Sequence, residues 1–163
     1  VPSHRRESFG GGLENTFRTI VRIANEFPDT LIVYPVHLNP NVQAPAKAIL
    51  ADHPRIRLLP PVSYSALLWL MSKANIILSD SGGIQEEAPS FSKPLLVLRE
   101  TTERPEAVDA GCAILVGPDE EKIFPHASRL LSDPAAYAAM AGKPNPFGDG
   151  KASERIADIL ATS

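Results

Sequence analysis

The chain has 163 residues, which suits one domain with a full hydrophobic core. It carries 16 Lys and Arg residues against 19 Asp and Glu residues, and the net charge of -3 argues against a general nucleic-acid-binding surface. No apolar stretch approaches the roughly 20 residues that cross a bilayer, so the sequence predicts no membrane-spanning helix.

The first predicted element is a helix over residues 13–27, ended by Pro28 and Asp29. Residues 31–36 form a short β-rich run that predicts a buried strand. Residues 40–45 are predicted to be a loop that opens a short helix ending near Ala51. The apolar residues of the first helix recur with the spacing of one helix face, at Leu13, Phe17, Ile20, Val21, Ala24 and Phe27.

Apolar runs and amphipathic stretches continue to alternate along the chain. The only cysteine, Cys112, allows no internal disulfide and no multi-cysteine metal site, which fits a reducing, cytoplasmic setting. Further strands are expected at residues 56–59, 75–78, 94–98 and 112–116. Further helices are expected at residues 64–74, 84–88, 105–110, 120–131 with a kink at Pro125, 134–141 and 152–161.

This alternation predicts the α/β class, as a Rossmann-like parallel sheet of about six strands with helices on both faces. Residues 1–163 would form a single domain. In such sheets ligands bind outside the carboxyl ends of the strands. Four polar motifs stand beside predicted strands and should therefore lie on one rim, at the carboxyl ends of the strands. They are HRRE at 4–7, HLNPN at 37–41, SGG at 81–83 and TTER at 101–104.

Ser81, Gly82 and Gly83 stand between a predicted strand and a predicted helix. Backbone N–H groups at a helix start lack partners and, together with the helix dipole, favour an anion such as phosphate. Glycine lets a ligand approach the backbone, and Ser81 adds a hydroxyl. A capping serine in a ligand-free tight turn explains these residues equally well.

Two acidic residues, Glu86 and Glu87, follow about one helical turn later. A carboxylate is a good acceptor for sugar hydroxyls, so Glu87 is a candidate for binding a ribose diol beside the phosphates. For Glu86 we favour a solvated carboxylate near a helix N-terminus.

Basic residues and histidines on the same rim are further candidates. His4 can act as an acid, a base or a hydrogen-bond donor near neutral pH, and Arg5 adds positive charge beside it. A surface basic cluster is the alternative for this pair. Arg104 suits phosphate because its planar fork donates two parallel hydrogen bonds. His37 either contacts a ligand or caps its strand. The alternative for Arg104 is an ion pair with Glu103, Glu106 or Asp109.

No histidine pair has metal-ligand spacing, and no G-x-G-x-x-G follows the first predicted strand. We therefore expect neither a metal nor a nicotinamide cofactor. A charged motif stands on the first residues without a preceding methionine, so we expect the chain to continue upstream of a domain boundary.

Four stretches together closely resemble the non-hydrolysing bacterial UDP-N-acetylglucosamine 2-epimerases: HRRESFG, VYPVHLNPNV, LSDSGGIQEEAPSFSKPLLVLRETTERPEAV and NPFGDGKASERI. The resemblance covers essentially the whole chain. It corresponds to the C-terminal domain of a two-domain glycosyltransferase-B-type fold. It implies that the acid and base carboxylates belong to an N-terminal domain absent from this chain, which alone would bind UDP weakly and would not epimerise.

The family that this sequence resembles interconverts UDP-GlcNAc and UDP-ManNAc by eliminating UDP to give 2-acetamidoglucal and then adding UDP back. No metal or nicotinamide takes part. The resemblance implies the following roles: phosphate contact and leaving-group support by His4 and Arg104, diphosphate contact by Ser81, Gly82 and Gly83, ribose contact by Glu87, and a second, allosteric substrate site at Arg5 and His37.

The segment that cradles uracil departs from the family pattern, which often reads Pro-Gln-x-Tyr followed by an aromatic residue. Here the sequence is PVSY at residues 61–64, with Leu67 in place of the aromatic residue. The resemblance therefore implies backbone contacts to the base near Val62, with Leu67 beside it.

Two other functions stay open: the hydrolysing relative, which releases free ManNAc and UDP, and a nucleotide-sugar binding module without chemistry. The expected partners are UDP, UDP-N-acetylhexosamine and the missing N-terminal domain, with no nucleic acid and no membrane. The family is commonly dimeric through its other domain, so we expect a homodimeric whole protein and a monomeric isolated chain.

Overall fold

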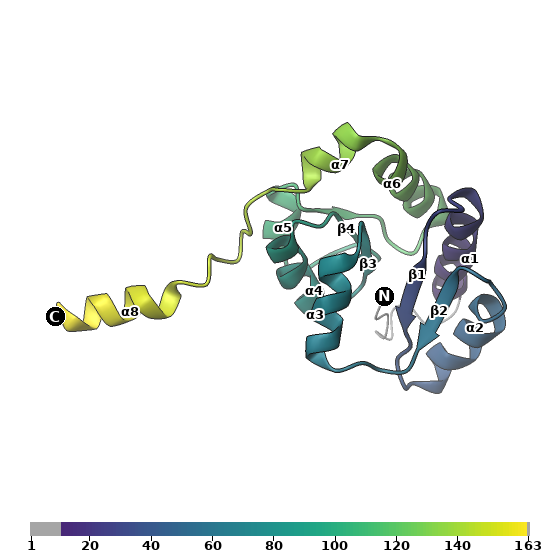
Figure 1. Cartoon of the computed structure of the whole chain (residues 1–163), viewed down its shortest axis with the longest axis horizontal. Helices are drawn as coiled ribbons and strands as arrows, with labels where there is room; N and C mark the ends of the chain where they lie inside the picture. The colour runs from purple at the N-terminus through teal and green to yellow at the C-terminus, as the bar shows by residue number, and fades with distance from the viewer. Residues whose placement is uncertain (1–10, 163) are drawn as a thin grey trace.

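The computed structural model describes residues 11–162 and shows an α/β fold with parallel strands (Figure 1). Two strands, β1 (Ile32–Pro35) and β2 (Ile56–Leu59), pair with each other. Three more, β3 (Ile77–Ser79), β4 (Leu95–Val97) and β5 (Ala113–Leu115), form a second sheet with β4 in the middle. The five predicted apolar runs are therefore confirmed as strands, each within about two residues of its predicted bounds.

The helices cover both faces of the strands. Ile77 and Leu78 are neighbours on β3, yet they belong to two different core clusters, one packed against α3, α4 and α5 and the other against α1 and α6. Parallel strands buried on both faces carry continuous apolar runs, which is the predicted pattern. The helices are α1 (Gly11–Glu26), α2 (Pro40–Leu50), α3 (Tyr64–Lys73), α4 (Gly82–Glu87), α5 (Pro105–Asp109), α6 (Glu120–Ser132), α7 (Pro134–Met140) and α8 (Ala152–Ala161), with a 3-10 turn η2 (Ala88–Phe91) after α4.

One feature of the sheet differs from the prediction. A single sheet of about six strands was expected, whereas residues 11–162 form five strands in two separate sheets. The separation lies between β1 and β3, which do not pair. A cavity occupies this place.

The predicted loop at residues 40–45 was wrong, because α2 already begins at Pro40. Asn39 caps the helix by accepting a hydrogen bond from the N–H of Asn41 at 3.0 Å. Proline suits the first helical position, where its missing N–H has no partner in any case. Val42, Ala46 and Leu50 are fully buried along one face. This burial outweighs the cost of Pro45 inside the helix.

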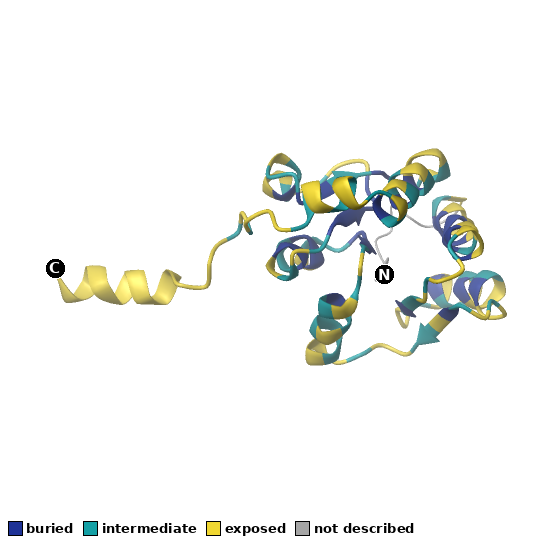
Figure 2. Ribbon diagram, turned by 45° about the horizontal axis from the view of Figure 1, so that its top comes forward, coloured by how far each residue is buried: buried dark blue, intermediate teal, exposed yellow. Residues whose placement is uncertain are grey.

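The last helix, α8, extends away from the rest of the molecule, and all its residues are exposed (Figure 2). Arg155, in the first half of α8, donates hydrogen bonds of 3.1 and 2.6 Å to the carboxylate of Asp149, which precedes the helix. These bonds lower the pKa of Asp149 below its ordinary value, with a smaller contribution from the N–H of Lys151. The sequence pattern predicted the bounds of α8 correctly.

Candidate functional site

The turn between β3 and α4 is the candidate anion site that the sequence singled out. Ser81 occupies the N-cap position with extended backbone angles, φ -78° and ψ 130°, and α4 starts at Gly82. The N–H of Ser81 donates to the Ser79 hydroxyl at 3.1 Å, which fixes the turn to the end of β3. Ser81 is the N-cap residue by position, but its side chain makes no capping hydrogen bond.

Neither Gly82 nor Gly83 is required by the conformation or the packing of residues 11–162. Both have negative or extended φ, outside the left-handed region that favours glycine. A Cβ added at Gly82 would meet nothing within 4 Å, and one at Gly83 would meet only the Ser81 hydroxyl at 3.9 Å. The backbone at the start of α4 is therefore open to a group from outside this part of the chain.

A buried glutamine connects this turn to the next loop, and sequence reasoning missed it. Gln85 is fully buried, and its side-chain amide donates to the carbonyl of Ser81 at 3.3 Å. Its carbonyl accepts a 2.5 Å hydrogen bond from the Thr102 hydroxyl, which in turn accepts from the N–H of Arg104 at 2.9 Å. This chain of contacts, the Gln85–Thr102 relay, holds the turn after β3 and the loop after β4 in fixed relation.

Arg104 is the N-cap residue of α5, and its guanidinium reaches across to α4. The Nε donates to the carboxylate of Glu86, and one terminal nitrogen donates to the carbonyl of Glu103 at 3.0 Å. The hydrogen bond that Arg104 donates to Glu86, and then the negative charge of Glu86, raise the pKa of Arg104. The Glu86 side chain is 42% accessible, so it is solvated as predicted, and it is paired with Arg104 as well.

The alternative of an ion pair between Arg104 and a neighbour in sequence also fails. Glu103 directs its carboxylate to Arg99 instead, which donates hydrogen bonds of 2.7 and 3.0 Å to its two oxygens. Arg99 is 9% exposed, so this pair ties the loop after β4 to the body of the domain. Arg104 remains partly exposed beside Glu86 of α4, with 37% of its side chain accessible.

Glu87 lies at the end of α4, one helical turn beyond Gly83, as predicted. Its carboxylate accepts a 3.0 Å hydrogen bond from the hydroxyl of Tyr64, the first residue of α3. This hydrogen bond, together with the charge of Glu87, raises the pKa of the Tyr64 hydroxyl. Tyr64 is 64% exposed, so the pair faces the solvent at the rim. Tyr64 is a second residue of the site that the sequence did not single out.

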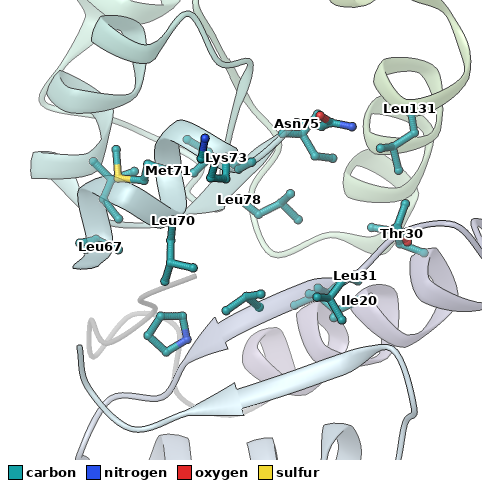
Figure 3. A pocket seen from close by; sticks show the side chains of 18 of the residues that line it. Ile20, Thr30, Leu31, Leu67, Leu70, Met71, Lys73, Asn75, Leu78 and Leu131 are labelled. Atoms are coloured by element: carbon teal, nitrogen blue, oxygen red, sulfur yellow. The ribbon is translucent and has the colours of Figure 1, made fainter. Parts of the chain in front are cut away.

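The two residues predicted near uracil lie on the same side of the molecule as Tyr64. Val62 is half-buried in the loop between β2 and α3, directly before the N-cap Ser63. Leu67 is also half-buried, but it packs against the core cluster of α3, α4 and β3 and lines the cavity between the sheets (Figure 3). The structure therefore gives Leu67 a packing role within this chain.

His37 is exposed and follows β1, at the carboxyl end of the sheet as predicted. Its Nδ1 accepts a hydrogen bond from the N–H of Asn39 at 3.1 Å. His4 and Arg5 lie outside the described residues. Within residues 11–162 no group of three or more His, Cys, Asp or Glu side chains has the arrangement of a metal site, and no helix there is long and apolar enough to cross a membrane.

The described part of the candidate site combines three kinds of chemical group on one rim of the parallel strands. The open N-terminus of α4 offers backbone N–H groups, Arg104 offers a fixed cation, and Glu87 offers an acceptor one helical turn away. This fold and this rim define a Rossmann-like α/β domain of the glycosyltransferase-B type, in which ligands meet the carboxyl ends of the strands.

Comparison with known proteins identifies the family. Residues 1–161 match the family model described as UDP-N-acetylglucosamine 2-epimerase, and the chain belongs to this family. A probable UDP-N-acetylglucosamine 2-epimerase of Ralstonia solanacearum is 54% identical over 156 residues, which are 96% of this chain and 42% of that protein.

Solved structures agree with this assignment. A crystal structure described as a putative UDP-N-acetylglucosamine 2-epimerase from Listeria monocytogenes superposes with a TM-score of 0.94 at 40% identity, over 99% of this chain and 43% of that one. The UDP-GlcNAc 2-epimerase of Neisseria meningitidis bound to UDP-GlcNAc has a TM-score of 0.91 at 47% identity, over 98% and 43% of the two chains. The chain thus spans less than half the length of these relatives.

Proposed function

We propose that this chain is the UDP-binding domain of a longer, two-domain enzyme that interconverts UDP-GlcNAc and UDP-ManNAc. The observation that supports this proposal best is the open Ser81 turn, with Arg104 fixed beside it and Glu87 one helical turn away. A nucleoside diphosphate presents an anion and a neighbouring ribose diol, which these groups complement. The family relative from Neisseria meningitidis is described as bound to UDP-GlcNAc.

In this proposal the diphosphate lies on the N-terminus of α4, where Ser81, Gly82 and Gly83 offer N–H groups and a hydroxyl. The Glu87 carboxylate accepts hydrogen bonds from the ribose hydroxyls, and Tyr64 holds that carboxylate in place. Uracil lies near Val62, with contacts to the backbone. Leu67 contributes through packing beneath this segment.

The reaction proceeds by elimination. The C1–O bond of the sugar breaks, the electron pair leaves with UDP, and a proton leaves C2 to give 2-acetamidoglucal. UDP then adds back to C1 while a proton returns to C2 on the opposite face. Arg104, together with His4, stabilises the charge that develops on departing UDP, which is a transition-state role. The acid and base carboxylates at the sugar are supplied by the N-terminal domain, so this chain alone does not epimerise.

Arg5 and His37 are proposed for a second, allosteric UDP-GlcNAc site on the same rim. Exposed His37 at the end of β1 supports this placement. The whole protein is proposed to be a cytoplasmic homodimer. Buried Cys112, free among the described residues, supports a reducing compartment.

The reaction is tested with the whole protein in heavy water. We expect UDP-GlcNAc and UDP-ManNAc to reach equilibrium while the C2 hydrogen of both is replaced by deuterium, followed by proton NMR. Stoichiometric accumulation of free ManNAc and UDP would instead identify the hydrolysing enzyme. Binding without any sugar conversion would identify a module without chemistry.

The nucleotide site is tested separately by following the thermal unfolding of this chain in millimolar UDP. A ligand that binds only the folded state raises its stability in proportion to ln(1 + [L]/Kd). We expect a small, saturable increase in Tm with UDP and none with uridine. A folded sample without any shift would contradict the assigned site.

A further inference from the structure

The segment between α7 and α8 packs against the second sheet and the helices on one of its faces. It spans residues 143–150, which we call the C-terminal strap, and continues past α5 to α8 (Figure 1). The Pro144 carbonyl accepts a 3.8 Å hydrogen bond from the Cys112 thiol, and half-buried Phe147 packs against the core cluster of α3, α4 and α5. The strap contains the motif NPFGDG, to which the proposed function gives no role.

Asn145 connects this strap to the end of α4 through its side-chain amide. The amide oxygen accepts a 2.9 Å hydrogen bond from the N–H of Phe147, which fixes the amide within its own loop. The amide nitrogen donates to the Ser90 hydroxyl of η2 at 2.7 Å and to the Glu86 carbonyl at 3.4 Å. Asn145 therefore joins two parts of the chain that lie more than 50 residues apart in the sequence.

The helix α4 depends on such contacts because it is short. It has six residues, whereas helices below roughly 12–15 residues are marginal in water without tertiary contacts. Pro89 has no N–H to donate to the carbonyl four residues earlier, and the regular helix gives way to η2 there. The start of α4 is held at Ser81 and its middle at Gln85. Asn145 holds its end.

The carbonyl that Asn145 contacts belongs to the peptide unit that joins Glu86 to Glu87. The side chains of these two residues have different partners, since Glu86 accepts from Arg104 and Glu87 accepts from Tyr64. The peptide unit is planar and rigid, so a rotation of it would displace both glutamates together. The amide of Asn145 opposes such a rotation.

We propose that Asn145 is a positioning residue of the nucleotide site. It acts through Glu86, which directs the Arg104 guanidinium, and through Glu87, which accepts from the ribose hydroxyls. The inference rests on the proposed function, because it assigns Asn145 to that same site. The packing of the strap is supplied separately by Phe147, so positioning and packing can be tested with different variants.

Two variants at position 145 of the whole protein test the proposal by steady-state kinetics and UDP calorimetry. Asn145→Ala removes the amide. Asn145→Asp keeps an acceptor for the Phe147 N–H and for the Ser90 hydroxyl, but an ionised carboxylate cannot donate to the Glu86 carbonyl. We expect each variant to weaken UDP binding and to lower kcat about fivefold, the factor that one ordinary hydrogen bond gives. A loss with Asn145→Asp alone would assign the effect to the added charge and overturn the proposal.

The matched control is Phe147→Leu, which reduces packing in the same strap and leaves the hydrogen bonds of Asn145 in place, because Phe147 donates through its backbone N–H. It should lower the Tm while kcat and UDP affinity per folded molecule stay unchanged. If Phe147→Leu lowered kcat and affinity as much as Asn145→Ala, packing of the strap would account for the effect and the proposal would fall. It would also fall if both Asn145 variants kept full kcat and affinity and lost only stability.

Double-variant cycles test the route by which Asn145 acts. Asn145→Ala should lower kcat little further in a protein that already carries Arg104→Ala, because the cation that Glu86 directs is gone. It should likewise weaken UDP binding little further beside Glu87→Ala. Additive losses in either cycle would overturn the proposal. A whole protein that neither binds UDP nor converts UDP-GlcNAc before any substitution would contradict the proposed function itself, and this inference would fall with it.

Discussion

Arg104 at the start of α5 donates its Nε–H to the carboxylate of Glu86 on α4, 18 residues earlier in the chain. This contact turns the guanidinium toward the helix whose N-terminus is the proposed anion site, and part of the side chain stays accessible. Arginine is protonated at any physiological pH, and Glu86 raises its pKa further. A phosphate that arrives at the Ser81 turn therefore meets a cation held in position before binding.

We expect Arg104→Ala in the whole protein to lower kcat about 100-fold, as the loss of one donor to a developing anion typically does. KM should change less, because the charge on UDP grows as the C1–O bond breaks. Arg104→Lys should recover only part of the rate, since lysine keeps the charge but loses the planar fork. Steady-state kinetics in both directions measure this.

The matched control is Arg129→Ala, which removes an arginine from the exposed surface of α6, where its side chain is 71% accessible. It should leave kcat and KM unchanged. If Arg104→Ala weakened UDP binding and kcat by the same factor, the residue would contribute uniform binding and not leaving-group stabilisation.

Glu87→Ala is expected to weaken UDP binding by the whole protein about tenfold or more, because it removes a charged acceptor worth about 1.5–3 kcal/mol per hydrogen bond. Tyr64→Phe removes only the hydroxyl that holds the carboxylate and should cost much less affinity. Calorimetric titration of both variants with UDP, and with ribose 5-diphosphate, which lacks uracil, separates the affinity lost by each variant. A loss from Tyr64→Phe as large as that from Glu87→Ala would show that the tyrosine itself binds the nucleotide.

The Gln85–Thr102 relay should contribute to stability as well as to geometry. Gln85→Leu removes the acceptor of the Thr102 hydroxyl proton and one of the two donors to the Ser81 carbonyl, and we expect a loss of about 1–3 kcal/mol in the free energy of unfolding. Thr102→Val removes the other end of the same hydrogen bond. Urea unfolding of both single variants and the double variant gives the coupling between them, expected at about 0.5–3 kcal/mol. Additive effects would show that the relay does not act as a unit.

Local patterns predicted most of the elements and the turn that carries the candidate site. The apolar spacing from Leu13 to Ala24 is sufficient for a helix, and a serine and two glycines after a buried strand are sufficient for the turn before α4. Glu87 follows at the spacing of one helical turn. All of these depend on residues within a few positions of one another, where the sequence carries the geometry.

Long-range contacts account for what could not be predicted. The pairing of Arg104 with Glu86 depends on how α4 and α5 pack, and the nearer Glu103 is taken by Arg99. Gln85 reads as a surface residue of a helix until the fold buries it completely. The gap in the sheet likewise depends on which strands lie side by side, which no local pattern states.

Cys112 is expected to react slowly with thiol reagents in the native protein. It is 3% exposed, and burial raises the pKa of its thiol above the ordinary value. A raised pKa means less thiolate at any given pH, and the thiolate is the reactive form. At about pH 8, Ellman's reagent should label the native chain far more slowly than the urea-unfolded chain. Equal rates would show that the segment directly before β5 opens readily.

The variant Gly82→Ala separates an effect on ligand binding from an effect on stability most directly. A methyl group at this position meets nothing within 4 Å, and alanine restricts the unfolded chain more than glycine does, so we expect stability to stay the same or rise by about 0.4–1 kcal/mol. The same methyl group would stand where the diphosphate approaches the N-terminus of α4, so UDP affinity should fall at least tenfold. The matched control is Gly111→Ala, at φ +75°, which should destabilise the fold and leave affinity per folded molecule unchanged. Thermal unfolding and UDP titration of both variants in the whole protein make this comparison. If Gly82→Ala bound UDP as tightly as the unchanged protein, no anion would approach this turn, and the phosphate would have to be held elsewhere on the rim.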